Sequence, residues 1–373
     1  MTDRILIFDR AVANHYASGL AAGLRAHGAR VTIAGPARTP GVAGIYPRSG
    51  VAGQKLAKLA DGALGAARLL GVLARERPTV LHFQWATAPN ALLARTLRPL
   101  LRARIVYTVH NPVPRGSAER WQRRLVERAD ALIVHGPLLR AQVCERYPGS
   151  DARLATVPIG NYELAATRTP RERACRELGL DPGVPVIAFV GQIVPRKGVD
   201  TLVDAFAQHC NRGGGGTLVI AGPLYAGDPS AWRDTLGEHA ARLHLEVADG
   251  DLPDALIDRV VSAATVVALP FHEASQSATV LLAMTHGRCI VSTALGEIGA
   301  TLATTGITVP PRDADALADA LAIADDPARA DALGARARER ALAEFDWHDL
   351  ARRTLAVYAS AGSRATATMA EPA

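Results

Sequence analysis

A glycine and two basic residues follow one apolar stretch in the second half of the chain. Residues 185–190 predict a buried strand, Gly191 comes directly after it, and Arg196 and Lys197 follow a few positions later. Because glycine has no side chain, a ligand can approach the backbone closely there. Positive charge at the start of the predicted helix 199–209 suits a phosphate or diphosphate. A solvated basic turn is the alternative.

A second polar cluster follows the predicted strand 265–269. It contains Glu273 and the triplet Ser275-Gln276-Ser277, and the apolar residues 281–284 then predict a buried helix. A serine of the triplet is the expected N-cap. Three successive backbone amides would form a second anion site at this helix start, those of Ser277, Ala278 and Thr279. Ordinary helix capping is the alternative.

The first half of the chain carries weaker candidates for a ligand-binding role. His110 and Asn111 follow the predicted strand 103–109, and a histidine there can donate to a ligand oxygen. Trp85 follows the predicted strand 79–83. A further group opens the predicted helix 15–27, namely Asn14, His15 and Tyr16. For each histidine, including His82 and His135, a structural role is the alternative.

Two series of alternating strands and helices must position these residues. One series runs from residue 4 to about residue 134, the other from 185 to about 344, and residues 156–170 form the expected linker. Such alternation predicts a parallel, doubly wound sheet in each half. Ligands of such sheets bind beyond the carboxyl ends of the strands, so we expect the functional residues to converge on a cleft between the domains.

Composition narrows the class of protein. A length of 373 residues is typical of two domains, and 49% apolar with 21% charged residues excludes wholesale disorder. The four cysteines are scattered, which argues against a zinc ribbon and fits a reducing compartment. The net charge of +6 suits an anionic partner. Dispersed basic residues and 5% aromatics disfavour nucleic acid, and the absence of Gly-x-Gly-x-x-Gly disfavours a nicotinamide dehydrogenase.

The sequence leaves the question of membrane contact open for one segment, residues 51–77. We find no window of about 18 uncharged apolar residues, so we expect no transmembrane helix, and the N-terminus does not read as a signal peptide. Residues 51–77 mix alanine and leucine with five basic residues. We expect a pair of amphipathic helices packed on a sheet, with a basic face resting on a membrane as the alternative.

Most of the chain resembles a retaining sugar-nucleotide glycosyltransferase of the GT-B fold, family 4 type. The matching stretches are FVGQIVPRKGVDTLVDAF at 189–206, LVIAGP at 218–223, residues 267–284, IVST at 290–293 and FDW at 345–347. In the first half, LHFQW at 81–85 and YTVHN at 107–111 resemble the acceptor domain of one branch.

The resemblance implies an α/β fold of two facing, Rossmann-like, doubly wound domains. Residues 1–165 would bind the acceptor and residues 166–345 the nucleotide sugar. A helix over 346–360 would cross back to the N-terminal domain, and residues 361–373 would form a disordered tail.

The resemblance also implies roles for site residues. His110, Lys197 and Glu273 would be catalytic, with Lys197 and Arg196 on the donor diphosphate and His110 near the anomeric carbon. Seven further residues would complete the donor site: Gly191, Gln192, Ser275, Gln276, Ser277, Ala278 and Thr279. The acceptor side would include Asn14, His15, Tyr16, Trp85 and Asn111. No metal ion and no cofactor are expected.

The chain departs from the family pattern at three places, one of which is the absence of the Gly-Gly turn that is common after the first strand. Family members usually carry an arginine soon after the first glycine, where this chain has Gln192. They also carry two glutamates eight positions apart, whereas Leu281 or Leu282 stands at the second position. A branch with a Ser-Gln-Ser donor loop in place of the two-glutamate motif accounts for this difference.

The implied function is retaining transfer of a sugar from a nucleoside diphosphate sugar to a hydroxyl acceptor, in bacterial polysaccharide or glycolipid assembly. The acceptor would be a saccharide, a lipid-linked molecule or a small molecule, and the enzyme would be cytoplasmic or peripheral on the inner membrane face. The alternatives are a pseudo-enzyme that only binds nucleotide sugars, a natural-product glycosyltransferase and a GT-B epimerase.

Overall fold

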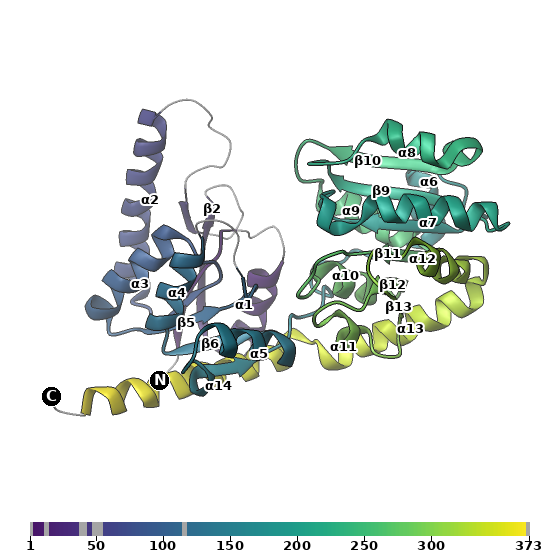
Figure 1. Cartoon of the computed structure of the whole chain (residues 1–373). Helices are drawn as coiled ribbons and strands as arrows, with labels where there is room; N and C mark the ends of the chain where they lie inside the picture. Colours follow the sequence, from purple (N-terminus) through teal and green to yellow (C-terminus); the bar gives the residue numbers. More distant parts are fainter. Residues whose placement is uncertain (1–2, 11–14, 37–42, 47–54, 114–117, 371–373) are drawn as a thin grey trace. The chain divides into compact units, whose positions relative to one another are not determined.

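A computed structural model describes residues 3–10, 15–36, 43–46, 55–113 and 118–370. The chain divides into two compact units, and the second is inserted into the first. Unit 1 comprises Met1–Gly160 and Asp346–Ala373, and unit 2 comprises Asn161–Phe345 (Figure 1). The boundary lies five residues before the expected one at 165/166, inside the predicted linker 156–170.

The described part of unit 1 forms a parallel sheet in the order β3-β2-β1-β4-β5-β6-β7. Its strands are β1 (Arg4–Phe8), β2 (Arg30–Pro36), β3 (Ala43–Tyr46), β4 (Val80–Phe83), β5 (Arg104–Thr108), β6 (Ala131–Val134) and β7 (Leu154–Thr156). The strand order reverses direction at β1, between β2 and β4. Central strands are buried on both faces, which explains their near-continuous apolar runs.

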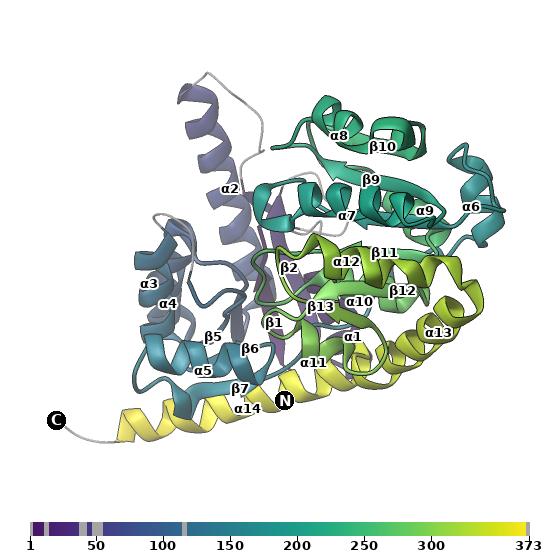
Figure 2. The ribbon, with the colours of Figure 1, turned by 45° about the vertical axis from the view of Figure 1, so that its right-hand side comes forward.

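Helices cover both faces of this sheet. They are α1 (Tyr16–Ala26), α2 (Lys55–Glu76), α3 (Ala88–Leu101), α4 (Ala118–Arg128), α5 (Pro137–Arg146) and α14 (Trp347–Ala370). One apolar core packs α2, α3, α4 and α5 against the sheet. The other core packs α1 and α14 against the opposite face. Figure 2 shows α14 as the long yellow helix along unit 1.

Trp347 anchors the C-terminal helix in unit 1. Its indole is 5% exposed and meets Tyr16 edge-on at 5.4 Å between ring centroids. Glycines at positions 19 and 160 leave the space that the indole fills, since a Cβ at either would collide with it. This aromatic contact helps to hold the last helix, which returns to the N-terminal unit as expected.

Replacing Trp347 with alanine should destabilise unit 1. Truncation of a buried tryptophan leaves a cavity, and such changes cost about 3–5 kcal/mol of unfolding free energy. Chemical denaturation monitored by circular dichroism would measure the loss, with Trp347→Phe as the control that keeps most of the buried area. Equal stability of the alanine variant and the wild type would show that the contact does not anchor α14.

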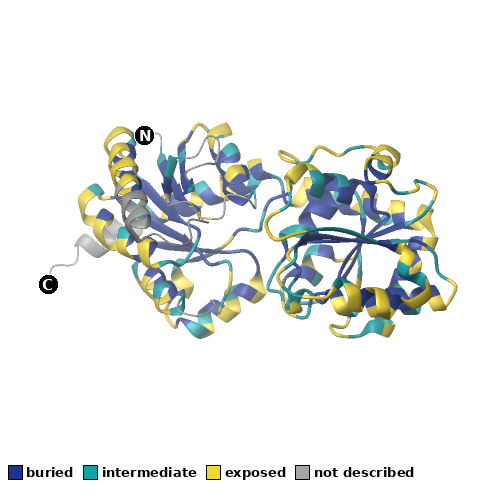
Figure 3. Cartoon of the chain, turned by 90° about the horizontal axis from the view of Figure 1, so that it is seen from above, coloured by how far each residue is buried: buried dark blue, intermediate teal, exposed yellow. Residues whose placement is uncertain are grey.

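Unit 2 forms a second parallel sheet in the order β10-β9-β8-β11-β12-β13. Its strands are β8 (Val186–Val190), β9 (Thr217–Pro223), β10 (Leu243–Ala248), β11 (Val266–Leu269), β12 (Cys289–Thr293) and β13 (Ile307–Val309). Its α-helices are α6 (Arg171–Glu177), α7 (Val199–Asn211), α8 (Pro229–Leu236), α9 (Asp254–Ala263), α10 (Ala278–His286), α11 (Ile298–Leu302), α12 (Ala314–Leu321) and α13 (Pro327–Glu344). In Figure 3 the buried strands run through the middle of each unit, with exposed residues on the outer helix faces.

Two expected elements differ in the structure. The segment 51–77 contains one helix, α2, rather than a pair, and Leu69, Val72 and Leu73 pack it on the sheet. The last helix does not end near residue 360 but continues to Ala370, so the expected disordered tail is largely helical. Residues 361–370 contain no proline and four alanines, the residue with the highest helix propensity.

None of the described helices has a stretch long and apolar enough to cross a bilayer. In the same part of the chain, His, Cys, Asp and Glu side chains form no group of three or more that could hold a metal ion.

Candidate functional site

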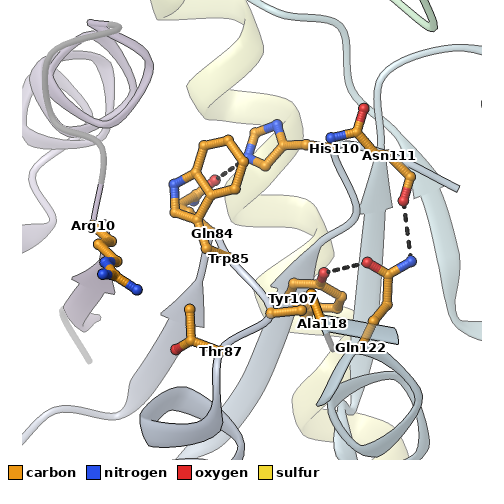
Figure 4. A pocket seen from close by; sticks show the side chains of 10 residues that line it. Arg10, Gln84, Trp85, Thr87, Tyr107, His110, Asn111, Ala118 and Gln122 are labelled. Atoms are coloured by element: carbon orange, nitrogen blue, oxygen red, sulfur yellow. Dashed lines mark hydrogen bonds between the residues drawn. The ribbon is translucent and has the colours of Figure 1, made fainter. Parts of the chain in front are cut away.

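Unit 1 contains a pocket of about 490 Å³ at the carboxyl ends of its central strands. The loops after β1, β4 and β5 and the start of α4 enclose it (Figure 4). Its lining residues are Arg10, Gln84, Trp85, Ala86, Thr87, Tyr107, His110, Asn111, Ala118 and Gln122. The pocket lies at the sheet edge where the alternation of strands and helices predicts a ligand site.

Trp85 forms an aromatic wall beside His110. The two rings stack with centroids 4.8 Å apart and planes inclined by 23°. The indole Nε1 donates a 2.7 Å hydrogen bond to Asp9 Oδ1, at the end of the neighbouring strand β1. This bond fixes the orientation of the indole, which suits it to stack on the apolar face of a ring-shaped ligand.

A chain of hydrogen bonds holds the His110 ring. His135 Nδ1 lies 2.9 Å from the Val157 carbonyl oxygen, so this nitrogen must donate. In a neutral His135 the other nitrogen, Nε2, therefore accepts, and it lies 3.0 Å from His110 Nδ1, which must donate to it. The lone pair of a neutral His110 is then on Nε2.

Gln84 completes this chain on the other side of His110. Its side-chain amide lies 3.0 Å from His110 Nε2 and 3.2 Å from His82 Nε2. A neutral His110 fits if the amide turns its NH₂ group toward His110 and its oxygen toward His82, a half-turn that exchanges nitrogen and oxygen. With the opposite amide orientation, His110 must carry protons on both nitrogens. The orientation of the Gln84 amide therefore depends on the charge of His110. The NH₂ group faces a neutral His110, and the oxygen faces a doubly protonated one.

His82 extends the network into the core. Its Nδ1 lies 2.7 Å from the Tyr358 hydroxyl on α14, and its Nε2 lies 2.7 Å from Thr108 Oγ1. The side chain is fully buried, so His82 does not line the pocket. It supports Gln84, and through it His110.

Burial keeps these histidines neutral. Removal from water lowers the pKa of His110 well below its usual value, and repulsion by His135 and His82 lowers it further. Burial likewise lowers the pKa of His135 to about 4 and that of His82 to about 3. The neutral network predicts the half-turned Gln84 amide described above.

The buried histidines should make unit 1 sensitive to acid. A folded-state pKa below the unfolded value of 6.5 means that the unfolded chain binds more protons, so stability is full above pH 6.5 and falls toward pH 4. His135 alone should account for about 3 kcal/mol of this loss. Urea denaturation across this pH range would measure it.

One variant isolates the contribution of His135. His135→Gln should lose less stability than the wild type between pH 6.5 and pH 4, because it has no imidazole to protonate. Parallel curves for wild type and His135→Gln would contradict the neutral, buried state of His135.

Polar groups on α4 form the other side of the pocket. Tyr107 Oη donates to Gln122 Oε1 at 3.0 Å, and Gln122 Nε2 donates to the carbonyl oxygen of Asn111 at 3.0 Å. Both bonds appear in Figure 4. They tie the loop after β5, which carries His110, to the start of α4.

The predicted acceptor-side residues have different positions. Trp85 and Asn111 line the pocket, as does His110. Tyr16 does not line it: this side chain is 6% exposed and packs edge-on against His110 and His135. His15 precedes α1 in a left-handed conformation and is not a lining residue. Asn14 lies outside the described residues.

In unit 2, the glycine and the basic turn follow β8 as expected. Gly191 has a φ of 142°, which side-chain-bearing residues rarely adopt, and the position of a Cβ there would lie 4.0 Å from Thr279 Oγ1. The segment Pro195–Lys197 forms a short 3₁₀ turn, and Gly198 in the left-handed region leads into α7. Gly191 thus brings the first cluster next to the start of α10.

The basic turn is attached to the loop after β11. The Arg196 carbonyl oxygen accepts hydrogen bonds from the backbone amides of His272 and Glu273, at 2.9 and 3.2 Å. Lys197 Nζ lies 3.8 Å from the centroid of the Phe271 ring. A cation above an aromatic face is held by the quadrupole of the ring, so Phe271 restricts where the ammonium group can lie. The two clusters therefore form one local site.

The start of α10 has the predicted cap. Ser277 is the N-cap, and its hydroxyl accepts from the Val280 amide at 3.4 Å. Backbone amides at Ala278 and Thr279 come next, in the first turn of a nine-residue helix. The Ser275 carbonyl accepts from the Glu297 amide at 2.8 Å, which ties the loop containing Gln276 to the start of α11. Glu273 and Gln192 are exposed.

Several pocket residues are not predicted from the sequence. Gln84 directly follows β4 and Arg10 comes two residues after β1, so their position after a strand was the available signal. Tyr107 lies within a strand, and Gln122 lies in a basic helix whose sequence carries no site pattern. These two contribute to the site only because β5 and α4 pack together.

Two doubly wound parallel sheets, with the last helix returning to the first unit, define the GT-B class of fold. Family comparison agrees with this class. Residues 13–160 match the model "Glycosyltransferase Family 4", and residues 184–324 match the model "Glycosyl transferases group 1". The chain belongs to this family of glycosyltransferases.

Curated relatives match part of their own length. A D-inositol 3-phosphate glycosyltransferase of Kineococcus radiotolerans is 33% identical over 64% of this chain and 58% of its own. An alpha-maltose-1-phosphate synthase of Mycolicibacterium smegmatis is 32% identical over 64% of this chain and 65% of its own. The matched region thus covers roughly three fifths of each relative.

Solved structures share the fold at low identity. Sucrose-phosphate synthase from Thermosynechococcus elongatus has a TM-score of 0.74 at 22% identity, covering 97% of this chain and 100% of that one. Anabaena HepE in complex with UDP-glucose has a TM-score of 0.68 at 16% identity, covering 95% and 99%. These similarities support the fold assignment.

Proposed function

We propose that this protein transfers a sugar from a nucleoside diphosphate sugar to a hydroxyl acceptor, with retention of anomeric configuration. The observation that carries the proposal is the attachment of the Arg196–Lys197 turn to the loop that leads into α10. Through this attachment, cationic side chains, the glycine backbone at Gly191 and the amides at the start of α10 lie together at the end of one sheet. That combination suits a diphosphate.

The basic turn would stabilise the leaving group. As the bond between the anomeric carbon and the diphosphate oxygen breaks, negative charge builds on the diphosphate. Lys197, Arg196 and the amides at the start of α10 would neutralise it. We propose that these groups act without a metal ion or a cofactor, and transfer that persists in excess EDTA would support this part of the proposal.

Retention would follow if the acceptor attacks the same face of the sugar ring from which the leaving group departs. The acceptor oxygen forms the new bond to the anomeric carbon, and its proton passes to an oxygen of the departing diphosphate. This route does not need the pair of carboxylates that a retaining glycosidase uses. Glu273 and His110 would contact the donor sugar in this scheme, and Gln84 and His135 would position His110.

The unit 1 pocket supports a polar, ring-containing acceptor. Trp85 offers a flat apolar wall, while Arg10, Thr87 and Asn111 offer polar groups around it. The names of relatives point to acceptors of this chemistry, since one is an inositol 3-phosphate glycosyltransferase. A saccharide, a lipid-linked saccharide and a small natural product all satisfy this description.

A transfer assay tests the proposal. The protein is incubated with UDP-, GDP- and ADP-sugars and with inositol 3-phosphate or simple glycosides, and product linkage is read by proton NMR. A new glycoside with the donor's anomeric configuration is expected. An inverted product would exclude retention, and epimerised donor without any acceptor product would favour the epimerase. Donor binding without turnover across the acceptor panel would favour the pseudo-enzyme suggested by the leucines at positions 281 and 282.

A further inference from the structure

A second cavity in unit 1 shares no lining residue with the pocket described above. It is a groove of about 570 Å³ between α3 and α4, which lie side by side in Figures 1 and 2. Its lining residues are Ala88, Pro89, Ala91, Leu92, Arg95, Trp121, Arg124 and Arg128. The set contains apolar and aromatic side chains and arginines, with no acidic residue. We call it the α3–α4 groove.

Arginines on α4 form a row beside the groove. Arg120, Arg124 and Arg128 are four residues apart and so share one face of the helix. The Arg120 and Arg124 guanidinium groups lie 4.5 and 4.8 Å from the Trp121 ring centroid. Trp121 thus lies between two cations at the groove.

These arginines lack carboxylate partners in the described part of the chain. Arg98 pairs with Asp130 and Arg146 with Glu119, whereas Arg95 and Arg124 form no ion pair with a described residue. The guanidinium group of an arginine that has no carboxylate partner can bind two oxygens of one phosphate group.

The groove also exposes a leucine. Leu92, one of its lining residues, is 58% exposed. Leucine beside arginine on one surface is the pattern of helices that rest at a membrane interface, where apolar side chains enter the acyl boundary and arginines reach the headgroups.

We propose that the α3–α4 groove binds an anionic phospholipid of a membrane surface. Arg95 and Arg124 contact the phosphate, while Leu92 and the apolar floor of the groove contact the acyl chain. The groove is complementary to such a lipid, because it combines arginines that lack an ion pair with a described residue and exposed apolar area. It places membrane contact on α3 and α4 rather than on the segment 51–77, where the sequence leaves such contact as the alternative.

Vesicle co-sedimentation tests this inference with the full chain and no sugar nucleotide, so it is independent of the proposed transfer activity. Binding to vesicles of phosphatidylcholine with phosphatidylglycerol is compared with binding to phosphatidylcholine alone. The wild type should prefer the anionic vesicles. The double variant Arg95→Gln/Arg124→Gln should bind them about tenfold or more weakly, since each surface cation adds to the attraction.

Matched variants separate the groove from overall charge. Arg173→Gln/Arg176→Gln removes the same charge from exposed positions on α6 and should bind like the wild type. Leu92→Ser should weaken binding about threefold, whereas Leu164→Ser, at a 67% exposed leucine of unit 2, should not. Equal loss in both arginine pairs, or no binding to anionic vesicles, would overturn the inference.

Discussion

Lys197→Ala should lower turnover by about 10²-fold or more while the protein remains folded. The ammonium group lies above the Phe271 ring, beside the loop that leads to the α10 amides. Removing a well-placed charge that stabilises a developing anion costs about 3 kcal/mol of transition-state stabilisation. Steady-state kinetics with the preferred nucleotide sugar would measure kcat.

Lys197→Met is the more stringent variant. Methionine keeps much of the apolar stem that packs on Phe271 but removes the charge, so packing and charge are separated. We expect its kcat to fall as far as that of Lys197→Ala, with a melting temperature close to the wild type. Unchanged turnover in a folded Lys197→Met protein would exclude the assignment of Lys197 to the diphosphate.

His110→Ala should reduce use of the nucleotide sugar much more than binding of the plain nucleotide. The ring lines the pocket and is held by His135 on one nitrogen and by Gln84 on the other. Its proposed partner is the sugar, so kcat/KM for the donor should fall by about 10- to 100-fold. Affinity for the nucleoside diphosphate alone should remain within about twofold of the wild type.

Steady-state kinetics gives kcat/KM for the donor, and nucleotide titration of the same preparation gives the affinity for the nucleoside diphosphate. The plain nucleotide is the internal control, because its phosphates are assigned to unit 2 rather than to His110. A parallel loss of nucleotide affinity and of kcat/KM would contradict a contact with the sugar and would indicate that His110 supports the fold.

Sequence periodicity located the long elements because their burial is strong. The runs 4–8, 186–190 and 289–293 are almost wholly buried, and a continuous apolar run is what a central parallel strand requires. The short edge strands β7 and β13 were not predicted, because each has three residues, too few to show a hydrophobic period. The sequence predicts a pair of helices over 51–77, whereas residues 55–76 form the single helix α2, whose Leu69, Val72 and Leu73 pack on the sheet.

The positions of the residues proposed for the donor side were predictable because these residues follow strands in sequence and therefore lie at one sheet edge in space. Gly191 and the start of α10 are adjacent for that reason. The environment of His110 was not predictable. Gln84, His135 and Tyr358 come from three distant segments, and only their packing creates the hydrogen-bond chain that holds the ring. The sequence also does not show that Tyr16 is buried beside His110 rather than lining the pocket.

The most direct measurement of the central claim is a thermal-shift panel of nucleoside diphosphates and their sugars on the wild type and on Lys197→Met. A ligand that binds only the folded state raises stability by RT ln(1 + [L]/Kd). We expect a rise in the melting temperature with the diphosphate of one base, and a much smaller rise in Lys197→Met. No rise with any nucleotide, or an equal rise in the two proteins, would contradict a diphosphate held by the Lys197 turn.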